Sequence, residues 1–252
     1  MTVTKITYSV IMPVYNGRKY FRNALQSALS ALGDGDEIVV IEDGSEDGGV
    51  GDVVAAVSDP RIRYEYQDNG GVASALNHGL KIAQNPYFAW LSHDDLFLPD
   101  RLREDRKLRR LCPDIVTFSA FYLFSDAAGY LNLVNKLKFA TSQHFPTRLL
   151  ARRFLNGCTV SAPISTLIKC GMFDVSLRHT QDYDMWLKIL EKQKFTYIER
   201  PTVLSRQHPE QDSKKLPAAA KAEFREILRR HGGQVKVTAK LFFDLLLILR
   251  SK

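Results

Sequence analysis

The sequence has few cysteines and no long apolar run, and both shortages exclude classes of protein. Its 252 residues contain three cysteines, at positions 112, 158 and 170, and no Cys-x-x-Cys pair. This pattern argues against a disulfide framework or a zinc site and favours a reducing compartment. No apolar run reaches the ~18 residues that a membrane-spanning helix needs. The nearest, LFFDLLLILR at positions 241–250, is shorter and contains Asp244.

Two familiar N-terminal signals are also missing. The first residues, MTVTKITYSVIMPVYN, have no charged leader followed by a long apolar stretch, so they predict a β-strand rather than a signal peptide. No Gly-x-Gly-x-x-Gly follows that strand, because Pro13-Val14-Tyr15-Asn16-Gly17 stands in its place, and this argues against a dinucleotide-dependent oxidoreductase. The expected location is the cytoplasm, with peripheral contact at the inner face of a membrane as the alternative.

The composition is that of an ordinary globular protein with a basic balance. Hydrophobic residues make up 45%, charged residues 25%, and the formal net charge is +7. This charge suits nucleic acid, anionic lipid or phosphorylated small molecules and does not choose among them. Residues 99–111 predict a basic helix. We interpret it as a solvent-facing helix, and predict no nucleic-acid partner, because no aromatic stripe is interleaved with its charges.

Strand and helix patterns alternate through the first hundred residues. Short apolar, β-branched runs predict strands, and apolar residues spaced three or four apart predict helices. The predicted strands are 6–14, 37–45, 62–66 and 87–91, and the predicted helices are 18–32, 50–57 and 72–83. This alternation predicts an α/β fold with a mostly parallel central sheet flanked by helices. Further on, the pattern predicts strands at 115–124 and 195–198 and helices at 146–155 and 182–192.

Polar residues follow three of the predicted strands. They are Pro13-Val14-Tyr15-Asn16, Glu42-Asp43-Gly44-Ser45 and Ser92-His93-Asp94-Asp95. Ligands of open α/β sheets bind outside the carboxyl ends of the strands, so we expect these segments to converge on one site.

Four segments, in this order, resemble the motifs of family 2 glycosyltransferases: SVIMPVYNGRKYFRNALQSAL, DEIVVIEDGSEDGG, NPYFAWLSHDDLFLPDRL and QDYDMWLKIL. The resemblance implies a GT-A fold, with a Rossmann-like central sheet, and inverting transfer from a nucleotide-diphosphate sugar. It implies a catalytic domain over residues 1–213, with a nucleotide-sugar-binding half (1–98) and an acceptor-side half (99–213). Residues 214–252 then predict a basic, helical C-terminal extension, broken at Gly232-Gly233.

In proteins that this chain resembles, the nucleotide lies at the first strand ends. Pro13 and Tyr15 would pack beside a pyrimidine base, and the Asp43 carboxylate would accept a hydrogen bond from its ring N–H. Asp43 also suits a simple turn before Gly44. Relatives often carry an arginine where this chain has Leu76, so positive charge for the phosphates would come from elsewhere. The predicted nucleotide-binding residues are Pro13, Tyr15, Asp43, Asn77, His93 and Asp94.

The acidic motif predicts a divalent metal site. Mn²⁺ or Mg²⁺ held by oxygen ligands neutralises a leaving diphosphate. The family pattern is Asp-any-Asp, and Ser92 replaces its first acid here, which leaves Asp94 as the expected ligand. Asp95 is then a sugar contact or a helix cap. The resemblance also makes Arg206 and His208 diphosphate contacts, with His208 a second metal ligand; a merely solvated histidine is the alternative.

Asp182 is the predicted general base, because transfer to a hydroxyl needs a group that takes its proton. An acid at a helix start is also stabilised by the helix dipole, so the residue type alone leaves both roles open. Asp184, two positions on, would point to another side of the helix. Cys158 has no partner histidine in a recognisable motif, so we interpret it as a side chain that packs in the protein interior and not as a nucleophile. The predicted sugar or acceptor contacts are Asp95, Gly157, Gln181 and Trp186.

Together these residues predict an inverting, metal-dependent transferase of hexosyl or related groups. A UDP-sugar is the first choice of donor and a dTDP-sugar the second. The acceptor would be a hydroxyl of a glycan, free or lipid-linked, in bacterial-type surface polysaccharide or glycoconjugate synthesis. The alternative is a catalytically impaired nucleotide-binding or regulatory module, motivated by Ser92. Residues 236–252 would contact a membrane surface, a partner domain or this domain's own core.

Overall fold

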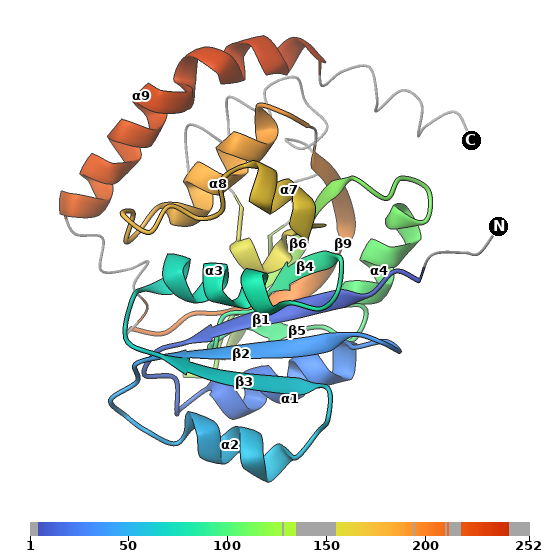
Figure 1. Ribbon diagram of the computed structural model, residues 1–252, viewed down its shortest axis with the longest axis vertical. Helices are drawn as coiled ribbons and strands as arrows, with labels where there is room; N and C mark the ends of the chain where they lie inside the picture. Colours follow the sequence, from blue (N-terminus) through green and yellow to red (C-terminus); the bar gives the residue numbers. More distant parts are fainter. Residues whose placement is uncertain are drawn as a thin grey trace.

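The computed structural model describes residues 5–127, 129–134, 155–193, 195–209, 211 and 218–241, without the side chains of 232–241. Strands and helices alternate through its first half, as predicted (Figure 1). The strands are β1 (Tyr8–Val14), β2 (Glu37–Asp43), β3 (Ile62–Gln67) and β4 (Tyr87–Trp90). The helices between them are α1 (Phe21–Ala31), α2 (Val50–Val57) and α3 (Val72–Ile82).

The second half of the chain is less regular. Its helices are α4 (Arg101–Arg109), a single 3-10 turn η1 (Gly157–Thr159), α7 (Ile164–Lys169), α8 (Gln181–Leu190) and α9 (Ala218–Leu241). Its strands are β5 (Leu96–Phe97), β6 (Val116–Ser125), β7 (Tyr130–Val134), β8 (Ser161–Pro163) and β9 (Phe195–Arg206). β9 is much longer than the predicted strand 195–198. Of the predicted helix 146–155, all but Leu155 lies outside the described residues.

The described strands form one sheet in the order β3-β2-β1-β4-β8-β6-β9-β5, with β7 paired to β6. The first four run parallel, so their carboxyl ends lie at one edge. β8 pairs antiparallel with β4 and β6 and joins this half to the second half. The predicted mostly parallel sheet is therefore confirmed for the half that carries the polar strand ends.

Side chains alternate between two cores on the two faces of the sheet. On β2, Val39 and Ile41 face the core beneath α3, α7 and α8, whereas Ile38 and Val40 face the core beneath α1, α2 and α4. Alternation with a period of two is what places successive strand residues on opposite faces. Because both faces of β1, β2 and β4 are covered, these strands are nearly continuous apolar runs that are easy to find in the sequence, whereas the outer strand β3 has no buried residue.

Helix α4 is not the solvent-facing basic helix that its composition suggested. Arg101 and Arg109 have no exposed surface. The Arg109 guanidinium donates to the Asp105 carboxylate at 2.8 Å, and Arg101 Nη2 donates to the carbonyl oxygens of Thr159 and Val160 at 2.9 and 3.0 Å. Arg101 therefore fixes the η1 turn, and Arg109 is paired with Asp105 of its own helix, because buried charges persist only when they are paired and hydrogen-bonded.

Helix α9 continues through the predicted break at Gly232-Gly233 and lies along α8 (Figure 1). The side chain of Ile227 is buried in the same hydrophobic core as the apolar residues of α8. The rings of Phe224 and Tyr183 meet edge-on, with centroids 5.7 Å apart. Among the described helices, none is both long and apolar enough to cross a membrane. Residues 242–252, the main part of the predicted membrane or partner contact, lie outside the described residues.

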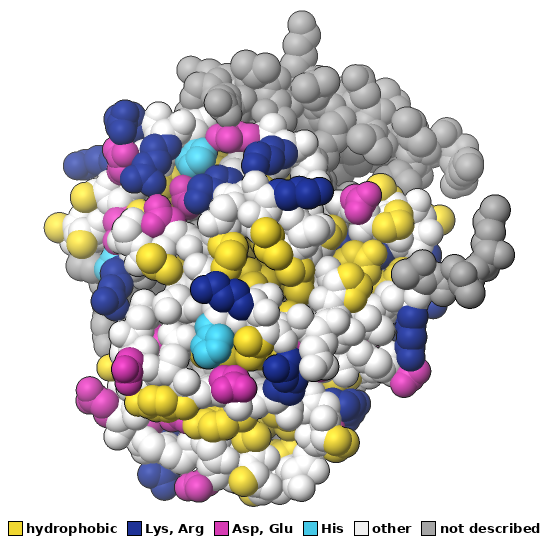
Figure 2. Space-filling view, viewed as in Figure 1, with side chains coloured by type: hydrophobic (Ala, Val, Ile, Leu, Met, Phe, Trp, Pro, Cys, Tyr) yellow, Lys and Arg dark blue, Asp and Glu magenta, His cyan; other side chains and the backbone are white. Residues whose placement is uncertain are grey.

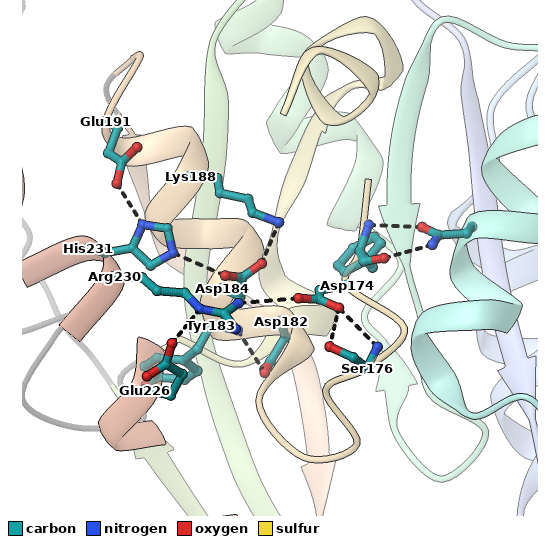
Figure 3. A network of polar contacts seen from close by, with 12 residues as sticks. Asp174, Ser176, Asp182, Tyr183, Asp184, Lys188, Glu191, Glu226, Arg230 and His231 are labelled. Atoms are coloured by element: carbon teal, nitrogen blue, oxygen red, sulfur yellow. Dashed lines mark hydrogen bonds and ion pairs between the residues drawn. The ribbon is translucent and has the colours of Figure 1, made fainter. Parts of the chain in front are cut away.

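A buried histidine fastens α9 to α8 (Figure 3). His231 Nε2 lies 3.0 Å from Asp184 Oδ1, and its Nδ1 lies 2.6 Å from Glu191 Oε1. Asp184 also pairs with Lys188. The hydrogen bond to Asp184, with that to Glu191, raises the pKa of His231 against the opposing effect of burial. The contact is therefore strongest when the imidazole is charged.

Stability should consequently fall as pH rises through the raised pKa of His231. A group with a raised folded-state pKa stabilises fully below its unfolded pKa, about 6.5 for histidine, and the contribution disappears above the folded value. We expect urea unfolding at a series of pH values to show this loss in the wild type and not in His231→Gln. His78→Gln is the control, because His78 contacts the Gln67 amide rather than an acid and should keep the wild-type slope. Equal slopes in wild type and His231→Gln would contradict the assignment.

Candidate active site

A cleft of about 860 Å³ opens at the carboxyl ends of β1 and β4. It brings together most of the predicted site residues, including those from segments more than a hundred positions apart. The predicted residues that line it are Pro13, Tyr15, His93, Asp94, Asp95, Gly157, Gln181, Asp182 and His208. Four predicted residues are absent from its lining: Asp43, Asn77, Trp186 and Arg206.

The turn after β1 is held by an asparagine. Asn16 has a positive φ of 49°, a conformation that asparagine tolerates better than most residues. Its Oδ1 accepts from the backbone N–H of Glu46 at 2.8 Å, which ties the end of β1 to the loop after β2. Tyr15 is left 42% exposed on the cleft wall, beside Pro13. This is a flat, partly apolar surface of the kind that a base can stack on.

Asp43 lies behind the cleft and is only 3% exposed. Its carboxylate accepts from Gln67 Nε2 at 2.7 Å and from the backbone N–H groups of Gly70 and Gly71 at 2.8 and 2.9 Å. Gly71 has a φ of +84°, which favours glycine. Asp43 thus fixes the loop before α3, and its Oδ2, which accepts one of these three hydrogen bonds, keeps a lone pair for a further donor.

Asn77 and Trp186 do not fit the ligand contacts predicted for them. Asn77 donates to the Phe173 carbonyl at 2.8 Å and accepts from the Phe173 N–H at 2.9 Å, so both ends of its amide are used within the protein. Trp186 is fully buried, with its ring edge-on to Phe173. Both residues support the wall of the cleft from behind.

Asp94 and His208 meet at the floor of the cleft. Asp94 Oδ2 lies 3.1 Å from His208 Nε2, and their side chains are 15% and 11% exposed. The His208 ring also packs against Tyr20, with centroids 4.9 Å apart. Asp94 lies after β4 and His208 lies after β9, so folding brings together two residues that are 114 positions apart in the sequence.

Arg206, predicted as a diphosphate contact, supports the acidic segment from within the protein and is not among the residues that line the cleft. It is 4% exposed, its guanidinium lies over the rings of Tyr20 and Phe124, and it pairs with Asp126. Arg206 Nε donates to the Asp94 carbonyl at 2.9 Å. Its stacked and paired guanidinium holds the acidic segment in place, because arginine satisfies several partners at once.

Asp95 and Ser92 complete the acidic segment. Asp95 Oδ1 accepts from the Arg206 backbone N–H at 2.9 Å, and burial together with the Asp94 charge raises the pKa of Asp95 to about 7. The helix-capping alternative for Asp95 is wrong, since the residue before α4 is Asp100. Ser92 takes the place of the first acid and hydrogen bonds with the Cys158 thiol, with Sγ 3.4 Å from Oγ. Burial raises the pKa of Cys158, consistent with the packing role predicted for it.

Asp182 lies in the first turn of α8 and lines the cleft. Its Oδ1 accepts from the Tyr183 N–H at 2.8 Å. Asp184 points to the other side, toward His231 and Lys188, as predicted from the helical spacing (Figure 3). Gln181 is 7% exposed, and its buried Oε1 has no hydrogen-bond partner among the described residues.

Several residues line the cleft although the sequence analysis assigned them no role in the site. Trp90 is one of them, and η1 approaches its ring closely: a β-carbon on Gly157 would lie 2.3 Å from Trp90 Cζ3. Arg178 also lines the cleft, with Nη1 3.5 Å from where a β-carbon of Gly71 would stand. Because this chain has Leu76 where relatives often carry an arginine, the sequence indicated that positive charge for the phosphates would come from another residue. Other lining residues without a predicted role include Lys19, Tyr20, Asn156, His179, Ser205 and Gln211.

The donor set at Asp94 and His208 fits a divalent cation that also binds the substrate. One carboxylate oxygen and one imidazole nitrogen converge, and Mg²⁺-type sites commonly use one or two protein ligands plus phosphate oxygens. Within the described ranges, no group of three or more His, Cys, Asp and Glu side chains could hold a metal alone. The pair therefore suits a site that the donor's phosphates would complete.

A second cavity, of about 500 Å³, lies at the amino end of β2. Its charged side chains pair within the protein: Asp36 with Arg106, Glu37 with Arg63, and Arg61 with Asp59. Parallel sheets bind ligands at the opposite edge. The cleft at the carboxyl ends is therefore the candidate site.

Comparison with known proteins decides the family. The family described as "Glycosyl transferase family 2" matches residues 9–173, which include β1 to β4, the acidic segment and α7. The chain belongs to glycosyl transferase family 2. The match ends before Asp182 and His208, so the comparison leaves the roles of those two residues open.

Curated relatives extend the likeness beyond that range. An uncharacterized glycosyltransferase of Rickettsia felis is 35% identical over 212 residues, which are 82% of this chain and 35% of that protein. TuaG of Bacillus subtilis, whose name proposes a role in teichuronic acid biosynthesis, is 29% identical over 201 residues, 76% of this chain and 75% of TuaG. The chain thus spans about a third of the Rickettsia felis relative.

Solved structures share the fold. TarS residues 1–349 of S. aureus, in complex with UDP-GlcNAc, superpose with a TM-score of 0.76 and 17% sequence identity, covering 96% of this chain and 72% of that one. At this identity the likeness shows the fold alone. This glycosyltransferase family member therefore has the predicted GT-A fold.

Proposed function

We propose that this glycosyltransferase moves a sugar from a UDP-sugar to a hydroxyl of a glycan acceptor with inversion at the anomeric carbon. The observation that carries the proposal is the meeting of the Asp94–His208 pair and Asp182 in one cleft at the carboxyl ends of the parallel strands. The TarS structure supports UDP as the nucleotide, since its ligand is UDP-GlcNAc. A dTDP-sugar is the second choice.

Asp182 would act as the general base. The acceptor hydroxyl attacks the anomeric carbon, its proton passes to the Asp182 carboxylate, and the bond to the nucleotide diphosphate breaks as the new bond forms. A single displacement inverts the configuration. The base sits on the first turn of α8, where its position is set by the helix and not by a loose loop.

Asp94 and His208 would hold Mn²⁺ or Mg²⁺. The cation would neutralise the charge that develops on the departing diphosphate. Arg178, which lies against Gly71 on the cleft wall, would supply the positive charge that Leu76 does not. Tyr15 and Pro13 would face the uracil, and the Asp43 carboxylate, which also holds the Gly70–Gly71 loop, would accept a hydrogen bond from its ring N–H.

The acceptor side of the proposal rests on relatives. The names of TuaG and of the chondroitin synthase of Pasteurella multocida place those proteins in polysaccharide synthesis. A surface polysaccharide or glycoconjugate, free or lipid-linked, is the acceptor class that fits them. Ser92 in place of the first acid favours a second candidate, a nucleotide-binding module with impaired catalysis.

A melting-temperature panel tests the proposed donor. UDP at a hundred times its dissociation constant should stabilise the protein by about 2.7 kcal/mol, which is a rise of about 5 to 10 °C for a chain of this size. We expect UDP and UDP-sugars to give this rise, a larger one with Mn²⁺, and ADP and GDP to give little. Equal shifts from all nucleotides, or none from UDP, would contradict the assignment.

A further inference from the structure

We propose that Glu223 on α9 is a positioning residue for the catalytic base, because it holds the segment that leads into α8. The inference rests on the base role proposed for Asp182. It assigns a function in catalysis to the C-terminal helix, which the sequence analysis treated as an extension beyond the catalytic domain. Two residues of the segment it holds, Arg178 and His179, also line the cleft.

The Glu223 carboxylate collects three hydrogen bonds from three consecutive residues. Oε1 accepts from the Arg178 N–H at 3.1 Å, and Oε2 accepts from the His179 N–H and the Thr180 hydroxyl at 3.0 Å each. Burial opposes ionisation of Glu223, but these hydrogen bonds outweigh it and lower its pKa. The charged carboxylate therefore matches a segment that presents only donors to it.

Thr180 shows why α8 needs this external support. It is the N-cap residue of α8, where a threonine oxygen usually accepts a hydrogen bond from the first turn. Here its side chain makes no capping bond to the helix and instead donates to Glu223. The start of α8 is thus fixed by α9, and Asp182 stands two residues further on.

The rest of α9 is well placed to keep Glu223 there. On the same side of the helix, Phe224 packs on Tyr183, Ile227 is buried, and His231 binds Asp184 and Glu191. Arg230 reaches Asp174 at 3.4 Å (Figure 3). Helix α9 therefore contacts residues that precede Asp182 in the sequence, such as Asp174, and residues that follow it, such as Tyr183 and Asp184.

Glu226 provides a matched control one turn away. Its carboxylate pairs with Arg229 and Arg230 of its own helix, and its side chain is 38% exposed. Figure 2 shows Lys and Arg side chains gathered over this part of the surface with acidic side chains among them. Glu226→Gln removes a charge from α9, as Glu223→Gln does, without touching residues 178–180.

The test measures UDP release from UDP-N-acetylglucosamine at saturating donor with Mn²⁺, together with amide hydrogen exchange. Glu223→Gln keeps one acceptor but turns an NH₂ toward the remaining donors. We expect kcat to fall about tenfold to 10²-fold, because small displacements of a reacting group have costs of this size. The amides of Arg178 and His179 should exchange at least tenfold faster, and Glu226→Gln should match the wild type in both.

Two results would overturn the inference. One is wild-type exchange at Arg178 and His179 in Glu223→Gln; the other is faster exchange with a kcat within twofold of the wild type, which would make Glu223 a structural anchor only. Failure of the proposed function is distinguishable, because the wild type itself would then release no UDP. In that case the exchange readout alone decides whether Glu223 holds the segment.

Discussion

Replacing Asp182 by asparagine is expected to lower sugar transfer by about 10² to 10⁴-fold, the usual contribution of a general base. Asparagine has the same shape, and its Oδ1 can still accept the hydrogen bond from the Tyr183 N–H that holds the aspartate. What it loses is the ability to take a proton from the acceptor hydroxyl. The measurement is kcat for UDP release, with the dissociation constant of UDP determined alongside.

UDP binding and melting temperature serve as controls for Asp182→Asn. Both should stay close to the wild-type values, because Asp182 is partly exposed and asparagine keeps the oxygen that accepts from the Tyr183 N–H. Asp184→Asn is not a suitable control, since Asp184 is buried between Lys188 and His231. A variant that keeps more than half of the wild-type kcat would remove Asp182 from the role of base.

Replacing Asp94 by alanine should reduce both catalysis and the effect of metal on donor binding. If Asp94 and His208 hold the cation, the variant loses a ligand with its charge, and the leaving diphosphate loses its counter-charge. We expect kcat/KM to fall by at least about 10²-fold, equivalent to roughly 3 kcal/mol of lost transition-state stabilisation. The additional rise in melting temperature that Mn²⁺ gives with UDP should disappear.

Asp52→Asn is the matched control for Asp94→Ala. Asp52 lies exposed on the first turn of α2, so its loss changes the net charge equally at a distance from the acidic segment. It should keep wild-type kinetics and the wild-type response to Mn²⁺. Unchanged Mn²⁺ dependence in Asp94→Ala would exclude Asp94 as a ligand.

The first half of the fold could be predicted from the sequence because both faces of its inner strands β1 and β2 are buried. Val39 and Ile41 face one core and Ile38 and Val40 the other, so β2 reads as a continuous apolar run with a polar end. The rule that ligands bind at the carboxyl ends of such strands then placed Tyr15 and Asp94 at one cleft. Local pattern and global fold agree here, which is what makes the prediction work.

The parts that failed depend on tertiary contacts that leave no local pattern. Arg206 and Arg101 are charged residues that the fold buries, and only their carbonyl and carboxylate partners reveal it. Asn77 is used by a backbone segment 96 positions away. Gly232-Gly233 reads as a break, yet α9 passes through it as helix because preceding turns are packed against α8.

The most direct test of the account is the release of UDP by the wild type and by Asp182→Asn side by side. UDP-sugars are supplied with Mn²⁺ and a panel of glycan acceptors, and UDP binding is measured in the same samples. The account predicts release by the wild type, a loss of about 10² to 10⁴-fold in the variant and equal UDP affinity in both. Equal UDP binding with no release from any UDP-sugar by the wild type would contradict it and identify a nucleotide-binding module instead.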